Sequence, residues 1–134
     1  MKKLSVSFFA FIAITLTACN GNAQQNNSNT QTSTIEVIQF HSEHRCMTCL
    51  KIEKLTKATL LNNYKSIPFR LVNIDDKNNS KITEQFEATG TALFLYNPKT
   101  GKKKDLTDFA FMKSGDEKKF EVELKKHIEE FIKG

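Results

Sequence analysis

The 134-residue sequence lacks the motifs of several large enzyme classes. With only five glycines it has no glycine-rich phosphate loop, and neither a Ser-His-Asp set nor a carboxylate pair is apparent. The formal net charge is +5; without Lys2 and Lys3, which belong to an expected export signal, 18 basic and 15 acidic residues leave +3. The basic residues are scattered and not interleaved with aromatic side chains. The sequence therefore does not predict nucleic-acid binding, and its length allows one folded domain.

Cysteine is scarce as well, and the first of the three cysteines lies near the N-terminus. Residues 1–18 combine a basic start with a short apolar run, and they end in Leu16-Thr17-Ala18-Cys19, which resembles a bacterial lipobox. They are predicted to be a lipoprotein signal peptide, with a lipid on Cys19. The alternative is an ordinary secretory signal with an incidental cysteine. The prediction places the protein outside the cytoplasm, anchored to a bacterial membrane in the periplasm or cell envelope.

Residues 19–33 follow as the lipidated cysteine and a tether of small polar residues, which bury too little apolar surface to fold. Residues 34–134 are predicted to be the folded domain. Lipid on Cys19 leaves Cys46 and Cys49 as a closed pair, which suits an exported protein better than three free thiols.

The pair Cys46-Met47-Thr48-Cys49 lies between a predicted strand (34–41) and a predicted helix (46–63). A cysteine at a helix N-terminus is stabilised as a thiolate, the species that attacks disulfides, and its pKa falls from about 8.5 to as low as 3.5–7.5. We expect His44 and Arg45 to add positive charge there. Cys46 would attack, and Cys49, one turn into the helix, would resolve the mixed disulfide. A purely structural disulfide is the alternative, although so short a loop stabilises a fold little.

The rest of the chain alternates between strands and helices. Strands are predicted at 69–74, 91–96 and 102–106, and helices at 77–88 and 116–133, the first of them ended by Gly90. Phe109 and Phe111 are expected to cover the core from a long loop at 107–114. Ile52, Leu55 and Thr59 form one buried stripe, and Phe120, Leu124, Ile128 and Phe131 form another. The order βαβαββα predicts a three-layer α/β sandwich around a four-stranded mixed sheet.

This order, with CxxC after the first strand, resembles the thioredoxin fold. More narrowly, four segments are similar to exported bacterial thioredoxin-family proteins that are labelled as a nitrophenyl-compound nitroreductase subunit. These segments are His41 to Cys49, Val72 to Asp75, Gly90 to Leu95 and Asp105 to Phe111.

The resemblance implies a thiol–disulfide oxidoreductase without a cofactor, a monomer that acts on protein thiols. It also implies a substrate groove at Met47, Thr48, Thr91 and Ala92. The sequence departs from the family twice. Thioredoxins carry a cis-proline where this chain has Ala92, and we expect a trans peptide bond there, because a cis bond without proline costs about 2.5–4 kcal/mol. Gln39 stands where thioredoxins have a buried acid that deprotonates the resolving cysteine.

Two other functions fit the same residues. His41, His44, Cys46 and Cys49 provide four nitrogen and sulfur donors within nine residues, which could bind copper or zinc in a metal-delivery module. Alternatively, the domain could be a redox-inert adaptor that uses the fold as a docking surface. His127, on the apolar stripe of the last helix, is expected to be a half-buried packing residue.

Overall fold

The computed structural model describes residues 34–134, so the predicted signal peptide, Cys19 and the tether lie outside the described residues. The elements are β1 Glu36–His41, α1 Met47–Asn63, β2 Phe69–Asn73, η1 Lys77–Asn79, α2 Ser80–Phe86, β3 Ala92–Tyr96, β4 Lys103–Asp105, α3 Thr107–Lys113 and α4 Glu117–Lys133. No helix in residues 34–134 has the length and apolar character that a membrane crossing requires.

The four strands form one mixed sheet in the order β2-β1-β3-β4. β1 pairs in parallel with β2 and antiparallel with β3, so that Val37 lies between Phe69 and Leu95. β4 extends β3 as an antiparallel hairpin. β1 is therefore a central strand, and the CxxC motif follows it at the edge of the sheet where β1 ends.

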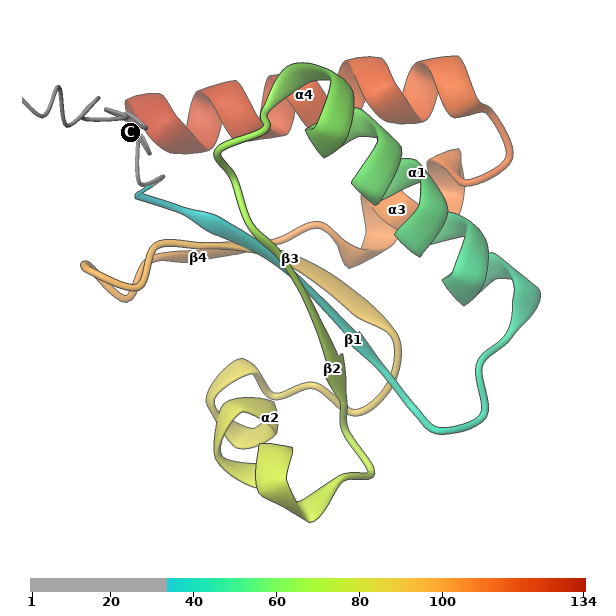
Figure 1. Cartoon of the computed structure of the whole chain (residues 1–134), viewed down its shortest axis with the longest axis vertical. Coiled ribbons are helices and arrows are strands. Elements are labelled where there is room, and N and C mark those ends of the chain that lie inside the picture. The colour runs from blue at the N-terminus through green and yellow to red at the C-terminus, as the bar shows by residue number, and fades with distance from the viewer. Residues whose placement is uncertain (1–33) are drawn as a thin grey trace, which may run out of the picture.

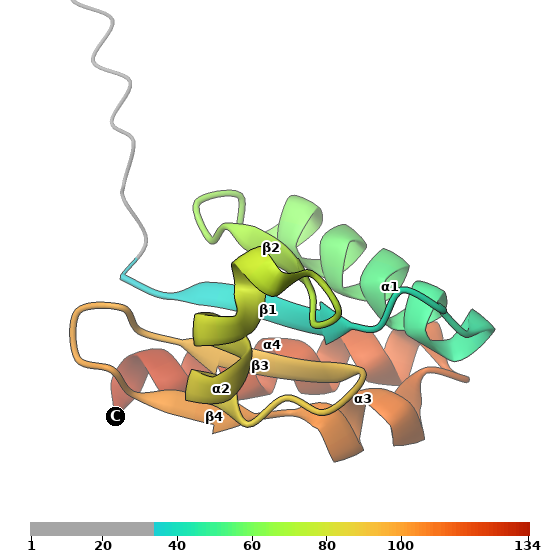
Figure 2. The same cartoon turned by 90° about the horizontal axis from the view of Figure 1, so that it is seen from below.

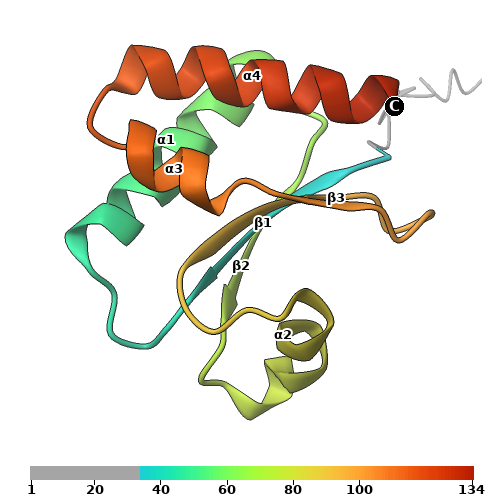
Figure 3. The ribbon, with the colours of Figure 1, turned by 180° about the vertical axis from the view of Figure 1, so that it is seen from behind.

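Helices cover both faces of this sheet. α1, α3 and α4 lie on one face, and α2 lies alone on the other (Figure 1). Figures 2 and 3 show the same division from below and from behind. The result is the three-layer α/β sandwich with a four-stranded mixed sheet that the sequence predicts, and it is consistent with a thioredoxin-like sandwich.

Each face of the sheet has its own core. On the three-helix side, Val37, Leu93 and Leu95 of the sheet pack against the buried stripes of α1 and α4. On the other side the core is aromatic, and it joins Ile38 and Val72 to the rings of Phe40, Phe86 and Phe94. The predicted stripes are confirmed: Ile52, Leu55 and Thr59 are buried, as are Phe120, Leu124, Ile128 and Phe131.

One prediction about the second half of the chain was wrong, and another was right in the position of the helix but wrong in where that helix ends. The loop expected at 107–114 is the short helix α3, in which Phe109 is buried against Phe120 and Phe111 is half exposed. The helix expected at 77–88 is a 3-10 turn followed by α2, which ends at Phe86 rather than near Gly90. Glu87 adopts the left-handed conformation there, with φ 54°.

Candidate redox site

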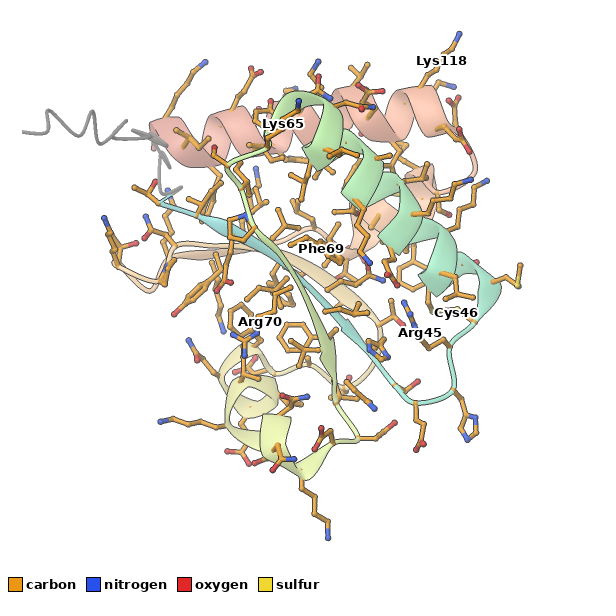
Figure 4. All side chains as sticks on the ribbon, viewed as in Figure 1. Arg45, Cys46, Lys65, Phe69, Arg70 and Lys118 are labelled. Carbon is orange, nitrogen blue, oxygen red and sulfur yellow. A yellow bond between two sulfur atoms is a disulfide. The ribbon has the colours of Figure 1, made fainter. Side chains whose placement is uncertain are left out.

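Cys46 and Cys49 form a disulfide at the N-terminal end of α1. Cys46 is exposed, whereas Cys49 is 4% exposed and packs beneath the first turn of the helix. Figure 4 shows Cys46 at the tip where the chain leaves β1 and enters α1. The two sulfur atoms therefore differ in access: an attacking thiolate reaches Cys46 from solvent and does not reach Cys49.

Cys46 is the N-cap residue of α1. Its backbone is extended, with φ −78° and ψ 161°, and its sulfur accepts a hydrogen bond from the backbone N–H of Cys49 at 3.2 Å. Its carbonyl oxygen accepts the first helical hydrogen bond, from the N–H of Leu50 at 3.1 Å. The first turn of α1 contains no acidic residue to offset the positive end of the helix dipole. This environment stabilises negative charge on the Cys46 sulfur when the disulfide opens.

The buried sulfur has a hydrogen-bond donor of its own. The hydroxyl of Thr91, which immediately precedes β3, donates to the Cys49 sulfur at 2.9 Å. The family resemblance implied that Thr91 lines the substrate groove. The contact of its side chain with the buried sulfur is a separate feature, and it joins residues 42 positions apart. If a thiolate opened the disulfide at Cys46, Cys49 would be the leaving group and its sulfur would gain negative charge. Thr91 is placed to stabilise that charge.

Thr91→Val is expected to slow opening of the disulfide about tenfold. It removes the hydroxyl that supports the leaving sulfur, and a hydrogen bond to a charged group contributes about 1.5–3 kcal/mol. Stopped-flow reduction by dithiothreitol measures this rate. Thr91→Ser keeps the hydroxyl and should react within a factor of about three of the original protein. Equal rates for valine and serine variants would show that the hydroxyl does not act on the sulfur.

Gln39 lies fully buried under the same turn of α1. Its side-chain N–H donates to the carbonyl oxygen of Cys49 at 3.0 Å. Its Oε1 has no hydrogen-bond partner among residues 34–134. A neutral amide thus occupies the place beneath the buried cysteine and cannot take up a proton there. The carboxylate of Glu43, which is close to the motif in sequence, belongs to an exposed residue. The backbone N–H of Glu43 donates to the side chain of Asp75 at 2.7 Å.

Arg45, in the loop before α1, forms an ion pair with a residue of that helix. Its guanidinium contacts Glu53, which also pairs with Lys57. Partial burial alone would raise the pKa of Glu53, but hydrogen bonds and positive charge from Lys57 and Arg45 outweigh it and hold the pKa below 4.5. Because its charge is shared with Glu53, Arg45 delivers less net positive charge to Cys46 than the sequence alone predicts.

Glu53→Gln is expected to lower the free energy of unfolding by about 1 kcal/mol at pH 7. Because the folded-state pKa of Glu53 is depressed, its stabilisation is fully present above pH 4.5 and is lost as the pH falls through the folded-state pKa. Urea unfolding from pH 7 to 3 should show the two proteins converging in acid. Glu84→Gln, which removes an exposed carboxylate on α2, is the matched control. A difference that persists unchanged at pH 3 would contradict this role.

The two histidines near the motif are placed differently. His41 ends β1, half-buried, and its Nδ1–H donates to the carbonyl oxygen of Ser42 at 2.8 Å. His44 is exposed on the loop before Arg45. Across residues 34–134, no three side chains of His, Cys, Asp or Glu lie together as a metal-binding group. His127, as expected, is half-buried, with its ring 5.0 Å from that of Phe109, and burial lowers its pKa.

Two hollows are lined by residues that neighbour the cysteines in sequence or in space. One, of about 550 Å³, lies beside the segment that leads into β3 and includes Thr91 and Ala92 in its lining. All peptide bonds in the described chain are trans, as expected for Ala92. The other, of about 380 Å³, lies on the exposed side of α1 and begins at Met47 and Thr48. The four residues expected to form one groove thus fall in two separate hollows, with Thr91 and Ala92 in the first and Met47 and Thr48 in the second.

Comparison with known proteins adds little to this geometry. No protein-family model matches the sequence, and no curated protein matches it. Among solved structures, the chain is similar to one described as "Structure of a malarial protein", with 20% sequence identity and a TM-score of 0.43. The match covers 60% of this chain and 96% of that one. A likeness at this level indicates no function.

Proposed function

We propose that the protein is a thiol–disulfide oxidoreductase that exchanges electrons with protein thiols through Cys46 and Cys49. The observation that carries the proposal is the unequal placement of the two sulfur atoms. One is exposed at a helix N-terminus, and the other is buried against a hydroxyl donor. A disulfide present only for stability would not need an exposed sulfur in an environment that favours thiolate.

The exchange proceeds in two balanced steps. A partner thiolate attacks the Cys46 sulfur, the Cys46–Cys49 bond breaks, and Cys49 leaves as a thiolate that takes a proton from solvent. The partner's second thiolate then attacks the partner sulfur of the mixed disulfide and releases Cys46. The partner is oxidised to a disulfide by two electrons, and the protein is reduced to a dithiol. The same steps in reverse reduce a partner disulfide.

The fold also supports a relationship with thioredoxin-like proteins, and this relationship is part of the proposal. The four-stranded mixed sheet, with the cysteine pair between β1 and α1, is the arrangement that the sequence resemblance implies. We further propose, from the sequence, that the protein belongs to the exported group it resembles and acts as a monomer tethered to a bacterial membrane through lipid on Cys19. This residue lies outside the described part of the chain.

Alkylation of the reduced protein tests the proposal. Brief treatment with iodoacetamide at pH 6, followed by mass spectrometry of peptides, reports which sulfur is a reactive thiolate. Cys46 should be labelled at least about ten times faster than Cys49, because it is exposed and lies at the N-terminus of α1, where a thiolate is favoured. Equal labelling, or faster labelling of Cys49, would contradict the roles assigned to the two residues.

A further inference from the structure

A shallow groove runs along the exposed side of α1, starting beside the reactive sulfur. It has a volume of about 380 Å³ and is lined by Met47, Thr48, Leu50, Lys51, Lys54 and Glu117. Positions 47, 50, 51 and 54 share one face of the helix. Glu117 comes from the first turn of α4, whose N-terminal end lies on the same side of the molecule as that of α1 (Figure 1).

The end of the groove nearest the disulfide is apolar. Met47 directly follows Cys46, and its side chain is 82% exposed. Leu50, one turn further, is 41% exposed. An exposed methionine is costly to leave in water, but its flexible thioether adapts to apolar side chains of different shapes. This end therefore suits an apolar residue next to the partner's reacting cysteine.

The far end of the groove is positively charged. Lys51 and Lys54 form no ion pair with any carboxylate of residues 34–134, whereas Lys57, one turn beyond, is paired with Glu53. Glu117 is the only acid in the lining, so the groove carries a net charge of one positive unit. The positive end of the α1 dipole lies at the other end of the groove, beside Met47. The net positive charge of the groove complements carboxylates rather than ammonium groups.

The dimensions of the groove favour a polypeptide over a small thiol. Lys54 lies seven positions after Met47 on α1, which corresponds to a rise on the order of 10 Å along the helix axis. About three residues of an extended chain span this length. A partner cysteine bonded to Cys46 would place the next few residues of its own chain along this face of α1.

We propose that this groove selects acidic polypeptide partners. An apolar residue beside the partner cysteine packs on Met47 and Leu50, and a carboxylate two or three residues away pairs with Lys51 and Lys54. The inference rests on the proposed exchange at Cys46 and adds the chemistry of the partner. This selection acts on the rate of encounter with the partner and on the stability of the mixed disulfide. The bonds made and broken remain those of the exchange described above.

Two peptides of equal length test this inference on the full chain carrying Cys19→Ser. Each has one cysteine next to a leucine; one continues with Asp-Glu and the other with Lys-Lys. The rate at which each opens the Cys46–Cys49 disulfide is divided by the rate for dithiothreitol, which is uncharged and does not span the groove. Because flanking charge alters the peptide thiol's own pKa, each peptide is compared with itself across protein variants.

The variant Lys51→Glu/Lys54→Glu should slow the acidic peptide about tenfold and speed the basic peptide by a similar factor. Lys77→Glu/Lys81→Glu makes the same change in net charge on η1 and α2, beyond the opposite face of the sheet, and should change either rate less than twofold. The effect of the first variant should shrink in 1 M salt, where the Debye length is about 3 Å.

Equal changes in the two double variants would show that only net charge matters and would overturn the inference. Unchanged peptide rates in the Lys51/Lys54 variant would overturn it as well. Neither result affects the proposed function, because both presuppose that dithiothreitol opens the disulfide. Failure of dithiothreitol and of both peptides to react with any variant would instead reject the proposed exchange.

Discussion

Cys46→Ser is expected to abolish thiol–disulfide exchange, whereas Cys49→Ser should trap partner proteins as stable mixed disulfides. Removal of Cys46 takes away the only sulfur of the pair that a partner reaches from solvent. Removal of Cys49 leaves an attacking thiolate with no second sulfur to release the partner. Non-reducing gels and mass spectrometry of protein recovered from cells would show adducts with Cys49→Ser and none with Cys46→Ser.

The loss of exchange cannot be ascribed to unfolding. By loop entropy, a bond across so few residues contributes no more than about 2 kcal/mol, and both serine variants lose it equally. Circular dichroism should show the same secondary structure in both. The double variant Cys46→Ser/Cys49→Ser is the matched control and should form no adducts. Full exchange activity in Cys46→Ser would remove this residue from the mechanism.

Phe40→Ala should lower the free energy of unfolding by about 3–5 kcal/mol. Phe40 is completely buried near the end of β1, and its ring lies 5.3 Å from that of Phe86 and 5.8 Å from that of Phe94. The substitution would leave a cavity in the aromatic core that holds α2 against the sheet. Urea unfolding monitored by circular dichroism gives the change in stability.

Phe111→Ala is the control for Phe40→Ala. It removes the same side chain from α3, where Phe111 is 41% exposed, and should cost about 0.5 kcal/mol or less. Comparable losses at the two positions would contradict the description of the aromatic core. If Phe40→Ala also altered the reactivity of Cys46, that would indicate that the end of β1 helps to hold the loop that carries the motif.

The sequence predicted elements whose pattern repeats over several turns. The stripe residues of α4, Phe120, Leu124, Ile128 and Phe131, recur every three or four positions, and all four are buried. α3 was not predicted because its seven residues are too few to show a period, and its N-cap residue, Leu106, has no side chain that can cap the helix. It is held as a helix by tertiary packing, with Phe109 against the rings of Phe120 and His127.

The cysteine pair was predictable from local sequence: the CxxC spacing and its place between a strand and a helix were sufficient to identify the pair and the helix N-terminus. Thr91 was named only through the family resemblance, and the contact of its hydroxyl with the buried sulfur joins residues 42 positions apart, so it depends on how distant segments pack. The pairing of Arg45 with Glu53 spans eight residues, and it depends on how the loop before α1 meets the helix.

A redox titration of Cys46 and Cys49 tests the central claim most directly. The chain carrying Cys19→Ser, purified without chelator, would be equilibrated in glutathione buffers of graded potential while bound copper and zinc are measured on the same sample. We predict a reversible two-electron transition in metal-free protein, with a midpoint that tells whether it oxidises or reduces its partners. Stoichiometric metal that blocks the titration, or a disulfide that does not respond to the buffers, would contradict the account.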